Sequence, residues 1–274
     1  MVASGALGFD GKGWWWEKPL VAVGLVKPEL FTIVTKTLTL KPRTGNLNLW
    51  KPWKSVRLLP NGGVVNKIDM TNPGIDWWCN KIAPNINFHK TKLVVSIFGE
   101  KDELVEMVKR LNQFPLLVGL EVNVSCPNTN QSMDTVEQVV GSIRAVREIS
   151  RHPIILKLSV EQDFLGIAEK ARDYVEAISL NSVPWKIVFG NKENPLLKLE
   201  GGVSGRSAQA YNWDAVKKLV TQNSLPVIAP SIMEYNDLAK VRDLGASALS
   251  FGAIHLRTPW KPTAIVEKEK KRRP

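Results

Sequence analysis

The residue types best suited to chemistry lie together in segment 121–129, which reads Glu-Val-Asn-Val-Ser-Cys-Pro-Asn-Thr. Its β-branched residues indicate a strand, and Pro127 removes a backbone donor, so the strand ends in a turn whose geometry Asn128 tolerates. Asn123 and Asn128 offer paired donors and acceptors for a planar polar ligand, and Cys126 offers a sulfur that accepts a proton. A strand end with a turn and an inert cysteine is the structural alternative.

Two lysines stand inside apolar runs, Lys36 in segment 31–39 and Lys157 in segment 154–159. A lysine in such a run must meet an anion or a polar partner, because an unpaired buried charge is costly. The pyrimidine edge of a reduced flavin is one such partner, and a structural ion pair is the other. His89, His152 and His255 fall outside the predicted strand ends, so a histidine base is not expected.

Two glycine-containing segments suggest a phosphate site. Residues 201–205, which read Gly-Gly-Val-Ser-Gly, precede a predicted helix, and Gly252-Ala253 follow the last predicted strand. Glycine lets a backbone approach a ligand closely with its amides free for an anion. The loop after the last strand is a frequent phosphate site in parallel barrels. Together the two segments indicate a phosphorylated cofactor lying across one mouth.

Apolar, β-branched runs alternate with amphipathic segments, the pattern of a parallel sheet with crossover helices. The predicted strands are 2–4, 31–39, 92–98, 117–124, 154–159, 177–181, 226–230 and 248–251. The predicted helices are 102–113, 135–150, 162–174, 212–222 and 236–244, with N-caps at Asp102 and Asp134 and a C-cap at Gly245. We predict one α/β domain, a (β/α)8 TIM barrel over residues 1–266, with an irregular insertion or small hairpin (41–74) after the second strand and a basic tail at 267–274.

Composition bounds the remaining possibilities. The chain has 274 residues, 44% of them apolar, which is ample for one packed barrel. No run approaches a membrane span, and the first residues do not resemble a secretory signal. Two cysteines, Cys79 and Cys126, cannot form a disulfide framework or a zinc site, so no metal and a cytoplasmic location are expected. The net charge of +11 is spread along the chain, which indicates solubility or attraction to anions more than a nucleic-acid groove. Trp14-Trp15-Trp16 and Trp77-Trp78 are assigned to core or interface rather than to a cofactor cover.

Several segments, in this order, resemble the dihydroorotate dehydrogenase family of FMN-containing barrels. They are 3–5 with 8–9, 34–37 leading to 39–46, 72–74, 123–128, 156–159, 181, 201–205 and 245–247, and they cover nearly the whole chain. Each is weak by itself, and the ordered set is specific.

The resemblance implies oxidation of dihydroorotate to orotate, with Cys126 as the base that removes the C5 proton while the C6 hydride passes to the flavin. The implied substrate-binding residues are Asn66, Asn72, Asn123, Asn128, Asn181 and Ser182. The implied FMN-binding residues are Ala3, Ser4, Gly5, Lys36, Thr37, Asn123, Lys157, Asn181, Ser204, Gly205, Ser231, Gly252 and Ala253. Cysteine rather than serine at the base position is similar to the soluble members, which argues against a quinone acceptor. Fumarate, or NAD through an electron-transfer partner subunit, both remain open, and a homodimer is expected.

The sequence departs from the family pattern at three places. It begins almost at Ala3-Ser4-Gly5, so the N-terminal strands that usually precede this segment in the family are not expected here. Ala229-Pro230-Ser231 stands where the family usually has a glycine pair for the flavin phosphate. The turn over residues 66–72 lacks the usual glycine and carries Asp69. Asp69 would face an anionic substrate, so we expect it to be kept away from the substrate or paired with a base such as Lys67.

Two other functions remain open. One is a related flavin enzyme acting on another dihydropyrimidine, including the tRNA dihydrouridine synthases, although no residues remain for their added RNA-binding domain. The other is a catalytically idle barrel that binds a partner. Flavin bound in stoichiometric amount would argue against the second.

Overall fold

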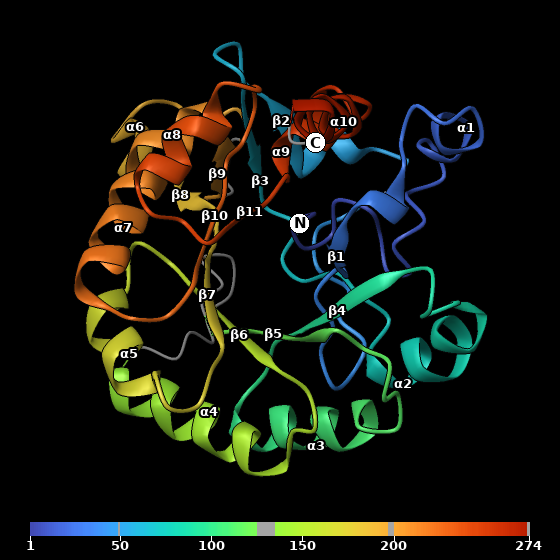
Figure 1. Cartoon of the computed structure of the whole chain (residues 1–274), viewed down its shortest axis with the longest axis vertical. Coiled ribbons are helices and arrows are strands. Elements are labelled where there is room, and N and C mark those ends of the chain that lie inside the picture. Colours follow the sequence, from blue (N-terminus) through green and yellow to red (C-terminus); the bar gives the residue numbers. More distant parts are fainter. Residues whose placement is uncertain (49, 125–134, 197–199, 273–274) are drawn as a thin grey trace.

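The computed structural model describes residues 1–48, 50–124, 135–196 and 200–272. Within them, seven strands form one sheet in the order of the sequence, and each pair of hydrogen-bonded neighbours is parallel. Figure 1 shows these strands surrounding the centre of the molecule. They are β1 (Thr32–Val34), β4 (Lys92–Ile97), β5 (Gly119–Asn123), β6 (Ile154–Leu158), β7 (Ala177–Leu180), β10 (Val227–Ala229) and β11 (Ala248–Leu249). The β-branched runs predicted from residue 31 onward therefore form the sheet, with shorter bounds.

The first predicted strand, residues 2–4, is not a strand. Val2 alone makes parallel bridges, one to Ile33 in β1 and one to Phe251 just after β11. The Met1 amine adds a hydrogen bond of 2.7 Å to the Leu249 carbonyl. The N-terminus consequently lies near the centre in Figure 1, between the first and last strands of the sheet. Val2 is fully buried, so its apolar side chain holds this junction.

The helices that cross between strands lie outside them (Figure 1). They are α3 (Lys101–Leu111), α4 (Val136–Ile149), α5 (Phe164–Ala171), α7 (Gln209–Gln222) and α8 (Asp237–Asp243). Each carries apolar residues on one face, which are buried in the common core with the outward side chains of the strands.

The two predicted N-caps differ from those in the structure, and the predicted C-cap is confirmed. Helix α3 begins after Glu100, which forms a capping box with Glu103, so Asp102 lies in the first turn and is not the N-cap. Helix α4 is capped by Thr135, whose hydroxyl accepts from the Gln138 amide, while Asp134 lies outside the described residues. Gly245 follows α8 with φ of 87°, the left-handed conformation expected of a glycine after a helix.

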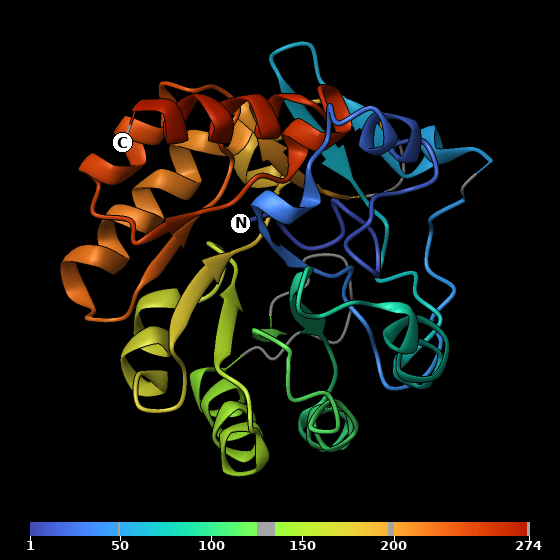
Figure 2. The same cartoon turned by 45° about the vertical axis from the view of Figure 1, so that its right-hand side comes forward.

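The insertion contains a small hairpin, one of the two forms that its sequence allows. Strands β2 (Val56–Leu58) and β3 (Gly63–Asn66) form an antiparallel hairpin, and β3 also pairs with β9 (Gly202–Gly205), which pairs with β8 (Val183–Pro184). This second sheet joins segments far apart in the chain. Figure 2 shows the hairpin, in light blue, extending from the rest of the molecule.

The remaining elements are short, apart from the last helix. They are α1 (Lys18–Ala22), α2 (Ile75–Trp77), α6 (Trp185–Phe189), α9 (Ala253–Arg257), α10 (Lys261–Arg272), the 3-10 turns η1 (Pro28–Leu30), η2 (Pro52–Lys54), η4 (Ala83–Asn85) and η5 (Arg206–Ala208), and the π-turn η3 (Trp78–Ile82). Helix α10 runs through the boundary predicted between residues 266 and 267. Glu269 holds it by accepting from the Tyr235 hydroxyl at 2.8 Å and pairing with Arg242 at 2.9 Å. In the described part of the chain, no helix is both long and apolar enough to cross a membrane.

Candidate active site

A cavity of about 450 Å³ lies where several strands of the large sheet end. Parallel strands carry ligand sites at their carboxyl ends, because the loops that follow them converge there. Most of the predicted site residues line this one cavity. They are Ala3, Ser4, Gly5, Lys36, Thr37, Asn66, Asn123, Lys157, Asn181, Ser182, Ser204, Gly205, Ser231, Gly252 and Ala253.

Three predicted residues stand apart from that set. Cys126 and Asn128 lie outside the described residues. Asn72 is described and does not line the cavity. Its side chain accepts from the Thr39 and Gly74 amides and donates to the Met70 carbonyl at 2.6 Å, so its amide holds the base of the insertion. These contacts favour a structural role for Asn72 over contact with a substrate.

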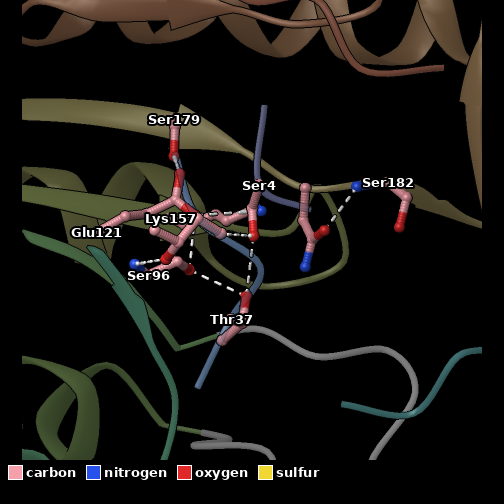
Figure 3. A network of polar contacts seen from close by, with 9 residues as sticks. Ser4, Thr37, Ser96, Glu121, Lys157, Ser179 and Ser182 are labelled. Carbon is pink, nitrogen blue, oxygen red and sulfur yellow. Dashed lines mark hydrogen bonds and ion pairs between the residues drawn. The ribbon is translucent and has the colours of Figure 1, made fainter. Parts of the chain in front are cut away.

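A buried carboxylate lies beneath Lys157 (Figure 3). Glu121 is 4% exposed, and its Oε1 lies 3.4 Å from Lys157 Nζ. The hydroxyls of Ser96 and Ser179 donate to the same carboxylate at 3.0 and 3.1 Å. These four side chains come from neighbouring strands β4, β5, β6 and β7. The sequence predicted a polar partner for Lys157, and the structure identifies Glu121 as one.

A chain of hydroxyls continues from Glu121 to the cavity wall (Figure 3). Thr37 Oγ1 lies 2.9 Å from the Ser96 hydroxyl and 3.0 Å from that of Ser4. Because Ser96 gives its only hydroxyl proton to Glu121, Thr37 must donate to Ser96, and the Ser4 proton turns toward Thr37 or toward the Thr35 carbonyl at 2.8 Å. In both cases Ser4 keeps its proton directed into the protein. The negative charge on Glu121 thus leaves Ser4 lone pairs available to a donor in the cavity.

Part of the cavity wall is built from glycines and short side chains. A Cβ added to Gly252 would stand 3.2 Å from the Ala3 Cβ, and one added to Gly205 would stand 2.9 Å from the Gly62 carbonyl oxygen. Ser231 stands where the family usually has one of its two glycines. Its φ is 65°, a value that glycine adopts more easily. Residues 202–205, predicted as a loop with free amides, instead form strand β9, so pairing with β3 and β8 uses part of their backbone.

Asp69 lines the cavity and is paired, but not with the expected base. Its Oδ1 lies 3.8 Å from Arg43 Nη2, and both side chains are about one-third exposed. Asp69 and Met70 both have positive φ, at 55° and 54°, in the turn that lacks the family's glycine. Two successive left-handed residues of this kind are uncommon, which indicates that the surrounding insertion holds the turn in place.

Trp14, Trp15 and Trp16 also line the cavity, whereas their sequence favoured a place in the core or at an interface. Trp14 stacks on Trp16 with ring centroids 5.3 Å apart, and its indole donates to the Gly5 carbonyl at 2.9 Å. Glu17, almost fully buried, accepts from the Trp14 amide at 2.9 Å. Aromatic rings therefore form part of the wall of the cavity that the polar side chains at the strand ends also line. Trp78, by contrast, is fully buried, as predicted.

The fold and the cavity define an α/β protein with a candidate site at the carboxyl ends of a parallel sheet, lined by polar side chains, glycines and aromatic rings. The family model described as dihydroorotate dehydrogenase matches residues 6–271, and the chain belongs to this family.

Relatives and a solved structure agree with that assignment. The chain is 32% identical over 97% of its length to "Dihydroorotate dehydrogenase B (NAD(+)), catalytic subunit" of Desulforudis audaxviator, covering 85% of that protein. It is 30% identical over 94% of its length to a protein of the same name from Geobacter metallireducens, covering 84% of it. The crystal structure of a ligand-free dihydroorotate dehydrogenase from Eimeria tenella has a similar fold, with a TM-score of 0.68 and 18% identity, over 86% of this chain and 75% of that one.

Proposed function

We propose that this protein oxidises dihydroorotate to orotate in pyrimidine biosynthesis, using FMN bound in the cavity. One observation carries the proposal: both predicted lysines, the amides of Asn123 and Asn181, and the glycine-containing segments of the phosphate site line the same cavity. Family membership and the names of the relatives support the reaction. We also propose that the sheet is a (β/α)8 barrel in which the N-terminal segment at Val2 completes the ring between β1 and β11.

The residues present fit FMN. Gly205, Gly252 and Ala3 let the backbone approach a phosphate closely, and Lys36 and Lys157 supply positive charge at the strand ends. Tryptophan rings form an apolar face suited to a flat ring system. When bound, FMN would supply the ring that accepts a hydride.

The chain's own residues have separate roles in the proposed reaction. Asn66, Asn123, Asn181 and Ser182 bind the ring and carboxylate of the substrate by hydrogen bonds, together with Asn128. Asn181 Oδ1 accepts from the Ser182 amide at 2.9 Å, which restricts the orientation of its side-chain amide. Cys126 takes the C5 proton as a thiolate, the form in which a cysteine can accept one.

The same proposal extends to partners. The relatives are named as the catalytic subunit of an NAD(+) enzyme, which supports an electron-transfer partner subunit here as well. We propose a homodimer of this chain as its core, located in the cytoplasm, with a dihydropyrimidine as the small-molecule substrate and no nucleic-acid partner.

The testing experiment is anaerobic bleaching of flavin in the purified protein by a panel of dihydropyrimidines, followed at about 450 nm. Dihydroorotate should bleach it, and the rate should rise with pH through the thiol range, because only thiolate removes the proton. Cys126→Ser should slow bleaching by orders of magnitude without releasing FMN. A chain that takes up no FMN, or that is bleached only by a neutral dihydropyrimidine, would contradict the proposal. Equal rates in the Cys126→Ser variant would assign the proton to another group.

A further inference from the structure

We propose that Glu121 is a positioning residue for the flavin side of the cavity, where its carboxylate acts as the fixed counter-charge of Lys157. The inference rests on the proposed function and goes beyond it, because it assigns a role to a residue that lies behind the cavity wall. Glu121 does not line the cavity, whereas Lys157 does.

The contacts distinguish this carboxylate from an ordinary surface ion pair. The side chains of Glu121 and Lys157 are only 5% and 12% exposed, so little water screens their interaction. Three donors surround the carboxylate: Lys157 on Oε1 at 3.4 Å, Ser96 on Oε1 at 3.0 Å and Ser179 on Oε2 at 3.1 Å. Hydrogen bonds from two hydroxyls stabilise the charged form of a carboxylate and fix its direction. The lysine is therefore paired with a rigid negative charge.

Sheet register places the pair. Strands β5 and β6 are in register with Asn123 opposite Lys157, and Glu121 lies two residues before Asn123, so it shares the same face of β5. Asn123 and Lys157 both reach the cavity, while Glu121 is one step deeper. Lys157 is thus positioned between a buried carboxylate behind it and the cavity in front.

Two consequences follow for a bound flavin. The carboxylate restricts the position of the Lys157 ammonium, and it also cancels part of the positive field that the ammonium creates in the cavity. A reduced flavin carries more negative charge than an oxidised one, so that field sets how strongly the protein prefers the reduced form. Glu121 would thereby set both the position of the Lys157 ammonium and the strength of the positive field that it creates at a bound flavin.

The test uses Glu121→Gln, which keeps the side chain's shape and one acceptor oxygen, removes the charge, and replaces the other carboxylate oxygen with an NH2 group, so that one of the two serine hydroxyls must accept instead of donate. The matched control is Glu176→Gln. Glu176 accepts from the Ile154 amide at the opposite end of the same strands and pairs with Arg147. Ser179→Ala is a second variant, which removes one hydrogen bond and leaves the charge in place.

The first measurement needs no flavin. Flavin-free protein is treated with an amine-acetylating reagent, and the rate at Lys157 is followed by peptide mass spectrometry relative to Lys240 in the same sample. Acetylation requires a mobile, uncharged amine, so loss of the counter-charge should accelerate it at least threefold in Glu121→Gln and leave it unchanged in Glu176→Gln. An unchanged rate at Lys157 in Glu121→Gln would overturn the inference, whether or not the chain binds FMN.

The second measurement is the midpoint potential of bound FMN, taken at the same pH for all variants. In Glu121→Gln, the preference for reduced over oxidised FMN should rise about tenfold, which corresponds to about 30 mV for a two-electron couple. Ser179→Ala should shift it much less. A potential equal to that of the wild type would overturn the inference, and it would leave Glu121 as a side chain that merely holds strands together. Failure of the wild-type chain to bind FMN would instead contradict the proposed function, and the acetylation rates would still decide the role of Glu121.

Discussion

Asp69 places a carboxylate in the wall of a cavity proposed to bind an anionic substrate. Arg43, 3.8 Å away, offsets part of its charge. Asp69→Asn removes the negative charge and retains a residue that tolerates the positive φ of this position. We expect KM for dihydroorotate to fall about three- to tenfold with kcat nearly unchanged, because a repulsion of about 1 kcal/mol on binding is removed.

Steady-state kinetics with a neutral dihydropyrimidine provides one control, since its KM should not respond. Asp76→Asn provides another, because Asp76 is largely exposed and pairs with Arg110 away from the cavity. An unchanged KM for dihydroorotate in Asp69→Asn would remove Asp69 from substrate recognition.

Cys79 is the cysteine whose surroundings the structure describes, and it is buried in the turn η3. Burial raises the pKa of its thiol to about 11. At pH 8 almost none of it is thiolate, so native protein treated with iodoacetamide should remain unmodified at Cys79 and react there only after unfolding. Peptide mass spectrometry checks this. Alkylation of Cys79 in the native state would show that a pH dependence of flavin reduction cannot be assigned to Cys126 alone.

Single residues show where sequence reasoning succeeds and where it ends. Burying Lys157 in an apolar run requires a polar partner, and that requirement is readable from sequence. The identity of Glu121 depends on the register of β5 against β6, which no local pattern encodes. Asp69 illustrates the same limit, because its partner is Arg43 rather than the adjacent Lys67.

At the scale of elements, α4 follows directly on the segment that contains Cys126 and depends on one cap. The Thr135 hydroxyl accepts a hydrogen bond from the Gln138 backbone amide at 3.2 Å, and the Gln138 side-chain oxygen accepts one from the Thr135 backbone amide. Thr135→Ala should lower the free energy of unfolding by about 1 kcal/mol, because it leaves a helix-end amide without its partner. Urea unfolding followed by circular dichroism measures this. Thr135→Ser keeps the cap and should stay within a few tenths of a kcal/mol, and an equal loss in both variants would contradict the capping explanation.

Local patterns predicted the elements of the large sheet and its covering helices well, because apolar periodicity and β-branched runs are local properties. They missed β8 and β9, since Val183–Pro184 and the glycine-rich Gly202–Gly205 have little strand propensity. These segments become strands by pairing with β3, a contact between distant parts of the chain. The same contact lines the cavity with Ser204 and Gly205, so part of the candidate site arises only with the tertiary structure.

At the scale of the whole molecule, the ends of the sheet meet through very few residues. Val2 bridges both β1 and the segment after β11, and the Met1 amine donates to the Leu249 carbonyl. A predicted three-residue strand thus reduces to one bridging residue, which nevertheless links two elements more than 200 positions apart. Strand propensity over three residues carries little information, which is why the sequence predicted a strand over residues 2–4 although only Val2 pairs with its neighbours.

Burial of the Met1 amine makes this junction sensitive to pH. Burial lowers the pKa of the amine from 8.0 to about 6, because the charged form is poorly solvated there. The unfolded chain therefore binds a proton at higher pH than the folded one does. The stability associated with the neutral amine is complete above pH 8 and is lost as the pH falls from 8 to 6. The loss should reach about 3 kcal/mol, from about two pKa units at 1.36 kcal/mol each.

Urea unfolding between pH 5 and 9 tests this dependence against the same chain acetylated at Met1, which cannot gain the proton. The two chains differ only at this amine, so the difference between the two curves isolates it. We expect the free-amine chain to lose stability relative to the acetylated chain as the pH falls through 8 to 6, with the difference constant below that range. Parallel curves throughout would mean that the amine reaches water in the folded protein and that Val2 alone holds the first and last strands together.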